Sequence, residues 1–317
     1  MSITLAAPRT APAHFKLFLT SVLWGATWPA GRVVATHMPP VSSASWRFSL
    51  AAILMLWLLR SRLGHWPRLT LRQYVWLGLC GAVGVLGYMI CFMWGLSLVT
   101  AGRGSLVIAL NPVVTALGAA WLLRERITPR MMLGMLLATV GALIVISHGE
   151  MQRLLLGDIG KGEIVLLGCV LCWAAYSLMS KVSMRFTDSL TATSYPIAVG
   201  TVLLLLFGGT IDTHIVHYAP AQPFDVTQVA WQVWGSLIFL SLGATVLAYL
   251  WFFEGVDKLG ATTASAYNTL VPVFGVLFSW ALLGERTDWS LLVGGGIAIG
   301  GIMLMNWTRK KVLAVTV

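Results

Sequence analysis

The chain has 317 residues, of which 58% are hydrophobic and only 10% are charged, and its mean hydropathy is +0.83. A soluble domain needs more charged residues than this to cover its exterior, so the composition excludes an ordinary soluble protein and favours one that lies in a bilayer. The net charge of +10 does not indicate a nucleic-acid partner, because the basic residues stand singly or in small clusters between apolar runs.

Ten apolar runs follow one another along the chain, each close to the length that a helix needs to cross a bilayer. They fall at about 16–36, 42–60, 73–97, 102–122, 130–147, 160–181, 190–209, 229–253, 261–283 and 290–307. Most connections are short, and two longer ones cover 148–159 and 210–228. We therefore predict an all-α membrane protein with ten transmembrane helices.

The basic residues are distributed unequally over the connections. With the N-terminus placed in the cytoplasm, 15 basic residues lie in cytoplasmic segments and four lie on the other side: Arg103, Arg153, Lys161 and Arg286. Cytoplasmic loops carry the excess of Lys and Arg in membrane proteins. We therefore expect both short tails, 1–15 and 308–317, in the cytoplasm of a bacterium, below its inner (plasma) membrane.

The second half of the chain repeats the first. Residues 111–128 and 271–288 align at a constant offset of 160, with Pro112 opposite Pro272. Near the start of each half the offset is 149, where LWGATWPAGR faces CWAAYSLMSK. This agreement predicts a duplicated unit.

The two predicted repeats are 16–147 and 160–307, joined by a linker at 148–159. Each repeat has five spans, an odd number, so the second copy enters the membrane from the opposite side. Two inverted repeats are a common plan for transporters, with a binding site near the midplane between them. The glycines of 294–296 and 300–301 have the small-residue spacing that suits close packing of membrane helices.

These motifs resemble the EamA family, which lies within the drug/metabolite transporter superfamily of ten-helix proteins. The resemblance rests on the segment 260–288, its partner in the first half, the start LWGATWPAGR, and Arg47 in the second span. It implies spans 1, 3, 4, 6, 8 and 9 around a central cavity, with spans 5 and 10 packed behind. Members export amino acids and other small metabolites, and the chain is similar to YddG-type relatives, which export aromatic amino acids.

Arg47 lies about five residues into the second span, roughly 8 Å from its end. An intramembrane arginine is costly and is a candidate functional residue by default. Two interpretations stay open: it holds a substrate carboxylate or sets a positive potential, or it caps helix carbonyls or extends to the interface. Arg32 and Lys181, near span ends, are interpreted as interfacial.

Aromatic side chains at mid-span are candidates for the wall of the cavity, since flat rings bind apolar or flat solutes by stacking. They lie on helices that the family uses for its cavity: Trp24, Trp28, Tyr88, Trp94, Trp173, Tyr176 and Tyr249. Trp24 and Trp28 share one helix face, as Trp173 and Tyr176 do. Helix packing is the alternative role for each ring.

Two asparagines stand next to prolines inside predicted spans. Asn111 precedes Pro112, and Asn268 lies four residues before Pro272. Proline frees a backbone carbonyl one turn back, and such positions often mark binding sites in transporters. We predict Asn111 and Asn268 as solute-binding residues, with an interhelical hydrogen bond as the alternative. As hinges we predict Pro29, Pro112, Pro196 and Pro272.

The eleven acidic residues lie in loops or at span ends. Without a deeply placed acid the chain is a poor exporter of cationic drugs by proton exchange, so neutral or zwitterionic solutes are favoured. Glu125 and Glu285, next to Arg126 and Arg286, are interpreted as structural ion pairs. The outer-loop residues Asp212, His214 and His217 are interpreted as a solvated loop rather than a metal site.

The sequence thus predicts a membrane transporter, not an enzyme, that exports amino acids or related small metabolites by alternating access. It needs no cofactor, metal or catalytic residue, and its partners are a small-molecule substrate and the lipid bilayer. We expect a monomer or a weak homodimer. Export of cationic or amphipathic drugs, a membrane-embedded enzyme and a receptor without transport activity are the alternatives.

Overall fold

The computed structural model describes residues 11–123, 127–150, 160–217, 229–259 and 267–315, and its regular elements there are helices. The first half contains α1 (Ala11–His37), α2 (Pro40–Leu63), α3 (Leu71–Gly81), α4 (Tyr88–Leu98), α5 (Ala101–Val107), α6 (Asn111–Leu123) and α7 (Pro129–Ile146). The second half contains α9 (Lys161–Ser183), α10 (Ser189–Ile211), α11 (Trp231–Ile238), α12 (Ala248–Leu259), α14 (Val271–Leu283) and α15 (Trp289–Val315). Short π-helical or 3-10 stretches continue several of them: η1 (Ala82–Gly87), η2 (Ile108–Leu110), η3 (Asp212–Val216), η5 (Phe239–Leu247) and η6 (Asn268–Leu270).

The helices have the length and composition of membrane spans. Seven helical stretches in the described residues are long and apolar enough to cross a bilayer: Pro40–Leu63, Leu71–Leu98, Ala101–Leu122, Pro129–Ile146, Lys161–Ser183, Ser189–Val216 and Trp231–Phe252. Asn268–Leu283 and Trp289–Leu304 are shorter apolar helices, and α1 adds 27 helical residues. The prediction of an all-helical membrane protein is confirmed.

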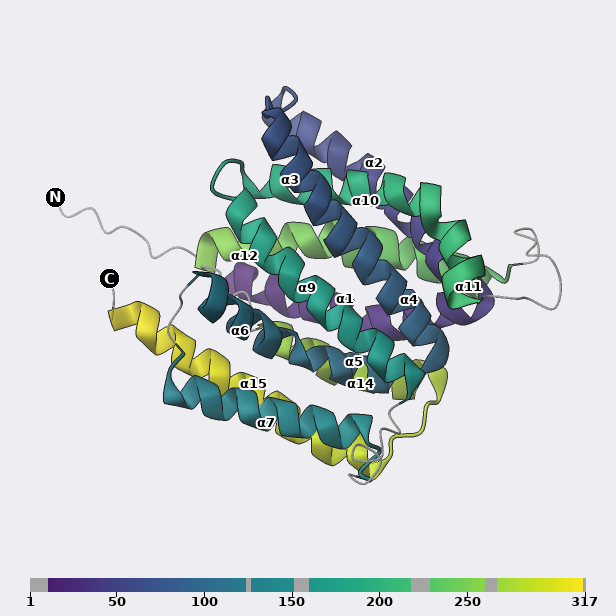
Figure 1. Cartoon of the computed structure of the whole chain (residues 1–317), viewed down its shortest axis with the longest axis vertical. Coiled ribbons are helices and arrows are strands. Elements are labelled where there is room, and N and C mark those ends of the chain that lie inside the picture. The colour runs from purple at the N-terminus through teal and green to yellow at the C-terminus, as the bar shows by residue number, and fades with distance from the viewer. Residues whose placement is uncertain (1–10, 124–126, 151–159, 218–228, 260–266, 316–317) are drawn as a thin grey trace.

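The helices form one bundle with two distinct edges (Figure 1). Helices α2, α3 and α10 lie along one edge, and α7 and α15 run side by side along the opposite edge. Between them, α1 packs against α4, α12 and α14, and α9 packs against α4 and α6. The residues with predicted binding roles lie mostly on these central helices.

Departures from α-helical geometry recur at the same offset as the sequence repeat. The 3-10 stretches η2 and η6 begin at Ile108 and Asn268, which are 160 residues apart. The π-helical stretches η1 and η5 end at Gly87 and Leu247, also 160 residues apart. Equivalent helices also pack on each other, α2 on α10 and α7 on α15. The two halves therefore share local backbone features as well as sequence.

Glycines bring α7 and α15 into backbone contact. A Cβ on Gly141 would overlap the backbone at Gly294 O, and a Cβ on Gly294 would lie 2.7 Å from Gly141 O. A Cβ on Gly301 would lie 2.5 Å from Gly134 O, whereas Gly300 has no neighbouring atom within 4 Å. The seam between α7 and α15 at these glycines therefore leaves no room for a side chain. The small-residue packing predicted for 294–296 and 300–301 is present at Gly294 and Gly301.

Glu285 connects the halves of the chain. Its carboxylate accepts hydrogen bonds from Ala101 N (2.9 Å) and Gly102 N (3.1 Å) at the start of α5, and from Ser279 Oγ. A carboxylate at a helix N-terminus satisfies free amides and interacts favourably with the helix dipole. The predicted Glu285–Arg286 ion pair is wrong, because these groups take the carboxylate instead, and its repeat partner, Glu125–Arg126, lies outside the described residues.

Asp212 is a second long-range cap. Its side chain accepts from Val41 N (2.8 Å), Ser42 N (2.7 Å) and Ser42 Oγ (2.6 Å) at the start of α2, and Asp212 is only 2% exposed. The prediction of a solvated loop is therefore wrong for Asp212, although His214 and His217 are exposed. The first amides of a helix have no acceptor within it, and Asp212 pairs with two of those of α2.

An ion pair between Arg103 and Asp288 ties α5 to the start of α15. Arg103 Nη2 lies 2.9 Å from Asp288 Oδ2, and its other nitrogen donates to Val145 O at the end of α7. Burial raises the pKa of Asp288, but the hydrogen bonds from Ser290 Oγ and Leu291 N, with the charge of Arg103, hold that pKa below its usual value. Asp288 is therefore ionised at neutral pH, as the pair requires.

Candidate functional site

The predicted aromatic residues gather where α1, α4, α9 and α12 pack against one another. On one side, the Trp24 ring lies 5.8 Å from the Tyr249 ring and 5.2 Å from the Phe252 ring, centroid to centroid. The indole N–H of Trp24 also donates to Ala244 O, 3.0 Å away in η5. This bond joins α1 to the π-helical stretch and fixes the orientation of the ring.

A second aromatic group lies between α4 and α9. The ring of Tyr88 is 5.6 Å from that of Trp173, which is 6.0 Å from Tyr176. Tyr88 also stacks on Phe92 at 5.8 Å, and Phe92 lies 5.1 Å from Trp28 of α1. An unbroken series of rings therefore runs from α1 through α4 to α9.

Trp28 and Phe92 differ from the other members of this series. Both are 2% exposed, and a Cβ on Gly104 or Gly275 would lie only 3.0 or 3.2 Å from the Trp28 ring. Trp24, Tyr88, Trp173, Tyr176 and Tyr249 each keep part of their surface accessible. Trp28 and Phe92 thus pack as core residues, whereas those five rings keep accessible surface.

Arg47 is buried between the two aromatic groups. It is 8% exposed, its Nε and Nη2 lie 3.3 and 3.2 Å from Thr245 Oγ1, and its guanidinium interacts electrostatically with Tyr88 and Tyr249. It also lies over the Phe48 ring, 5.1 Å from the centroid. No carboxylate in the described part of the chain forms an ion pair with Arg47.

A buried cation whose partner is a neutral hydroxyl is poorly compensated. Removing a charge from water costs several kcal/mol unless an opposite charge or several hydrogen bonds replace the solvent. Thr245 supplies one oxygen, and that hydroxyl also donates to Leu240 O at 2.9 Å. The arrangement can therefore accept an additional anionic group at Arg47.

The side-chain amide oxygens of the two predicted asparagines are buried and lack a hydrogen-bond donor in the part of the chain that the structure describes. Asn111 Oδ1 and Asn268 Oδ1 have no hydrogen-bond donor among the described residues. Asn111 starts α6 and Asn268 starts η6, so each lies beside one of the two repeat-related 3-10 stretches. Orphaned amide oxygens inside a protein are rare and call for an explanation, such as a donor supplied by a ligand or by water.

The prolines behave in two ways. Helices α1 and α10 continue through Pro29 and Pro196. Pro112 and Pro272 instead follow the 3-10 stretches, in which the amide just before each proline donates to the carbonyl three residues back. That bond partly replaces the one that proline removes, so the freed carbonyls are less available than the sequence suggests.

Trp94 lies apart from the central rings, one turn before the end of α4. Its ring faces Lys161 Nζ, 5.1 Å from the centroid, at the start of α9. The position equivalent to Trp94 at the 160-residue offset is Glu254, which lies 2.6 Å from Lys16 Nζ of α1. Each contact joins the first helix of one half to the third span of the other.

Arg32, which the sequence suggested to be interfacial, lies near the end of α1 with its head group bonded. Its guanidinium donates to Leu96 O at the end of α4 and is half-buried. Three further residues of the centre escaped sequence reasoning: Phe92, Thr245 and Phe252. Phe92 and Phe252 follow Tyr88 and Tyr249 by one helical turn, a signal that was available, whereas nothing local marks Thr245.

Comparisons with known proteins agree on one family. The model of the EamA-like transporter family matches residues 11–147 and again residues 160–307. The uncharacterized transporter YyaM of Bacillus subtilis is 28% identical over 92% of this chain and 93% of its own length. A probable terminal-alkyne amino-acid exporter of Streptantibioticus cattleyicolor is 28% identical, covering 94% of each protein.

Two further matches are more distant. A probable amino-acid metabolite efflux pump of Salmonella typhimurium is 24% identical over 92% of this chain and 93% of its own length. One solved crystal structure matches with a TM-score of 0.62 and 20% identity, covering 94% of this chain and 98% of that one. That likeness supports the fold alone.

Proposed function

The chain belongs to the EamA-like transporter family, and we propose that it exports amino acids or closely related small metabolites, with aromatic or other neutral ones favoured. It is a multi-pass membrane transporter and not an enzyme. Alternating access through the region between α1, α4, α9 and α12 is the proposed mechanism. The relatives named as an amino-acid exporter and an amino-acid metabolite efflux pump support this class of solute.

The observation that carries the proposal is the buried, poorly compensated Arg47 between two groups of aromatic rings. In the proposed complex the solute carboxylate binds the Arg47 guanidinium, and its side chain lies against Trp24 and Tyr249 or against Tyr88 and Trp173. Charge-assisted hydrogen bonds of this kind are about twice as strong as neutral ones. A zwitterion would thus supply the anion that Thr245 does not.

Asn111 and Asn268 are proposed to complete the site. An amide oxygen accepts hydrogen bonds, so both free Oδ1 atoms suit the ammonium group of an amino acid. The 3-10 stretches beside them are proposed, with Pro112 and Pro272, as the places where the central helices bend during transport. Pro29 and Pro196 remain proposed hinges, and Trp94, which faces Lys161, is proposed to contact the solute only on its way to or from the centre.

We also propose ten spans in two inverted five-helix halves. The double match of one family model, the 3-10 and π-helical stretches 160 residues apart, and the packing of α2 on α10 and α7 on α15 support this plan. The unequal distribution of basic residues supports cytoplasmic termini in a bacterial inner membrane. One such chain contains a whole pathway, which favours a monomer or a weak homodimer.

Flux of radiolabelled amino acids into proteoliposomes tests the proposed substrate class. We expect counterflow of tyrosine, phenylalanine or tryptophan above that of empty vesicles, and competition by other neutral amino acids. Absence of flux for every amino acid would overturn the proposal. If flux is absent but the protein confers drug resistance that Trp24→Ala or Trp173→Ala removes, the alternative, export of cationic or amphipathic drugs, is favoured.

Arg47→Gln tests whether the guanidinium binds the carboxylate. We expect flux of the amino acid to fall roughly tenfold or more, because a charge-assisted contact is lost. Decarboxylated analogues, which lack the carboxylate, provide the readout that a structural role would not change. In the wild-type protein these analogues should compete only weakly for transport. In Arg47→Gln they should compete as well as the amino acid does. Unchanged selectivity in Arg47→Gln would assign the residue to helix packing.

A further inference from the structure

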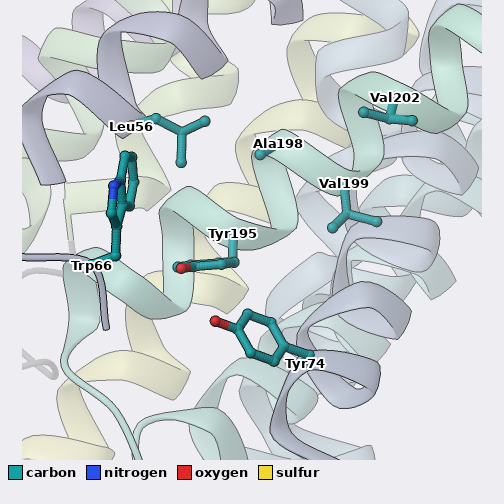
Figure 2. A pocket seen from close by; sticks show the side chains of 7 residues that line it. All are labelled: Leu56, Trp66, Tyr74, Tyr195, Ala198, Val199 and Val202. Atoms are coloured by element: carbon teal, nitrogen blue, oxygen red, sulfur yellow. The ribbon is translucent and has the colours of Figure 1, made fainter. Parts of the chain in front are cut away.

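An open groove lies on the edge of the bundle formed by α2, α3 and α10, away from the central aromatic groups. Its volume is about 410 Å³, and Figure 2 shows its lining side chains. One end carries Trp66, Tyr74 and Tyr195, and the rest is lined by Leu56, Ala198, Val199 and Val202. The groove thus has an aromatic end and an aliphatic length.

The aromatic end lies near the ends of the helices, and the aliphatic part runs towards the middle of α10. Tyr195 and Val202 are seven residues apart on α10, a rise of roughly 10 Å. The rings of Tyr74 and Tyr195 are 5.6 Å apart, and the Tyr74 hydroxyl lies 3.5 Å from Pro67 O. Trp and Tyr with polar tips are typical of the level of lipid head groups.

The connection beside this aromatic end is strongly basic. Arg60, Arg62, Arg68 and Arg72 are exposed and have no ion pair with any described residue. The sequence holds no Asp or Glu before Glu125. The basic residues therefore face no acidic neighbour on their own helices, and Trp66 stands in the middle of them.

The facing helix brings one acidic side chain, and it forms no ion pair with these arginines. Asp188 precedes α10, but its two carboxylate oxygens accept from Thr191 N (2.9 Å) and Thr191 Oγ1 (2.6 Å). It acts as the cap of its own helix, and Arg185 nearby adds a further exposed positive charge. The groove mouth is therefore complementary to an anion with an apolar tail.

We propose that this groove binds one anionic diacyl phospholipid from the leaflet at the α2–α3 end. An acyl chain lies along Leu56, Val199 and Val202, and the phosphate contacts arginines of the segment 60–72. Polybasic segments next to a membrane attract anionic lipids, and pockets between helices select their head groups. The site does not depend on which solute the protein carries.

Native mass spectrometry of the detergent-purified chain tests the proposal, with phosphatidylglycerol and phosphatidylcholine as probes. We expect one phosphatidylglycerol retained per chain under conditions that strip phosphatidylcholine. Val202→Trp fills the groove and should abolish that retention. Leu206→Trp is the matched control: Leu206 is also exposed, one turn further along α10 and outside the groove, so retention should persist.

Charge is tested separately by the double variant Arg68→Gln and Arg72→Gln. We expect roughly a tenfold or greater loss of phosphatidylglycerol retention, since each basic residue near the surface adds to the attraction. Arg185→Gln should have a smaller effect. Melting temperatures of all variants establish that they are folded.

Three results would overturn the proposal. Equal retention of both lipids would remove the charge argument, and no retained lipid at all would remove the site. A dimer mass that Val202→Trp converts to monomer would assign the groove to contact between two copies of the chain.

Discussion

The α7–α15 edge and the central helices are held together by opposite means. At the edge, backbone meets backbone at Gly141–Gly294 and Gly301–Gly134, and no side chain separates the helices. In the centre, the contacts are made by aromatic rings and by Arg47, whose guanidinium bonds to a single hydroxyl. Two amide oxygens there have no donor among the described residues. The edge is closely packed along its seam, whereas the centre contains polar groups whose hydrogen bonding is incomplete.

This difference separates scaffold from site. Close packing leaves one arrangement of minimum energy, because even a small displacement gives overlap or a void. The centre also contains π-helical and 3-10 stretches, which are less regular than α-helix and are frequent at functional sites. We therefore expect substitutions at the edge to affect folding and substitutions in the centre to affect transport.

Gly141→Leu should destabilise the protein more than any substitution in the centre. The new side chain would overlap Gly294 O and Ala298 N, which are backbone atoms that cannot rotate away. We expect the yield of folded protein to collapse, or the apparent melting temperature in detergent to fall by many degrees, since overpacking costs about 1–3 kcal/mol or more.

Gly300→Leu is the matched control on the same helix pair, because nothing lies within 4 Å of a Cβ at Gly300. Its melting temperature should stay near that of wild type. If both leucine variants fold equally well, the α7–α15 seam is not the scaffold that its packing indicates.

Glu285→Ala should follow, with a loss of stability of about 1–3 kcal/mol, because Ala101 N would lose its acceptor inside the protein. Gly102 N would keep Ser279 Oγ, 3.0 Å away, as an acceptor. Glu254→Ala is the comparison, since its partners, Lys16 and Lys258, can return to solvent. Melting temperatures measured side by side decide the matter: equal losses would contradict the distinction between a carboxylate that caps backbone amides and one that pairs with lysines.

Trp24→Ala should lower the flux of the preferred solute per folded molecule roughly tenfold, since a stacking ring is lost. Trp24→Phe keeps an aromatic ring but loses the hydrogen bond to Ala244 O. Its flux should lie between that of wild type and that of Trp24→Ala. Trp57→Ala, at an exposed ring of α2, is the control and should transport normally. Equal flux in all three variants would remove Trp24 from the proposed site.

The sequence predicts helices well and long-range polar contacts poorly. Apolar runs at 42–60 and 130–147 correspond to α2 (Pro40–Leu63) and α7 (Pro129–Ile146), because the length of a membrane span is set by the bilayer. Aromatic residues placed by repeat position did come together in two groups. The central position of Arg47 was a hypothesis, and its neutral partner Thr245 could not be foreseen.

What the sequence could not predict was which groups meet across the fold. Glu285 bonds to amides 184 and 183 residues away, and Asp212 to amides 171 and 170 away. Both were assigned to local partners or solvent, since sequence neighbours are the only ones visible without the packing. The π-helical stretches were missed for the same reason: they depend on tertiary contacts, and no residue pattern marks them.

The smallest expected effect concerns the ion pair of Lys16 and Glu254, which lies at the opposite end of the molecule from the Glu285 cap. The pKa of Glu254 is lowered because Lys16 Nζ and Lys258 Nζ donate to its carboxylate, at 2.6 and 2.7 Å. A carboxyl group whose pKa is lower in the folded state stabilises the fold above its unfolded pKa of about 4.3, and this contribution is lost as pH falls through the folded value.

Glu254→Gln should therefore lower the stability slightly near pH 7, by less than about 1 kcal/mol, and this deficit should shrink as the pH falls below about 4. Lys16→Met should have a similar small effect, and the double variant should lose less than the sum of the two, because the residues share one contact. A deficit of Glu254→Gln that persists in acid would mean that Glu254 stabilises the protein by packing rather than by charge. The contacts around Glu254 would then stabilise the protein by packing, as those of the α7–α15 edge do.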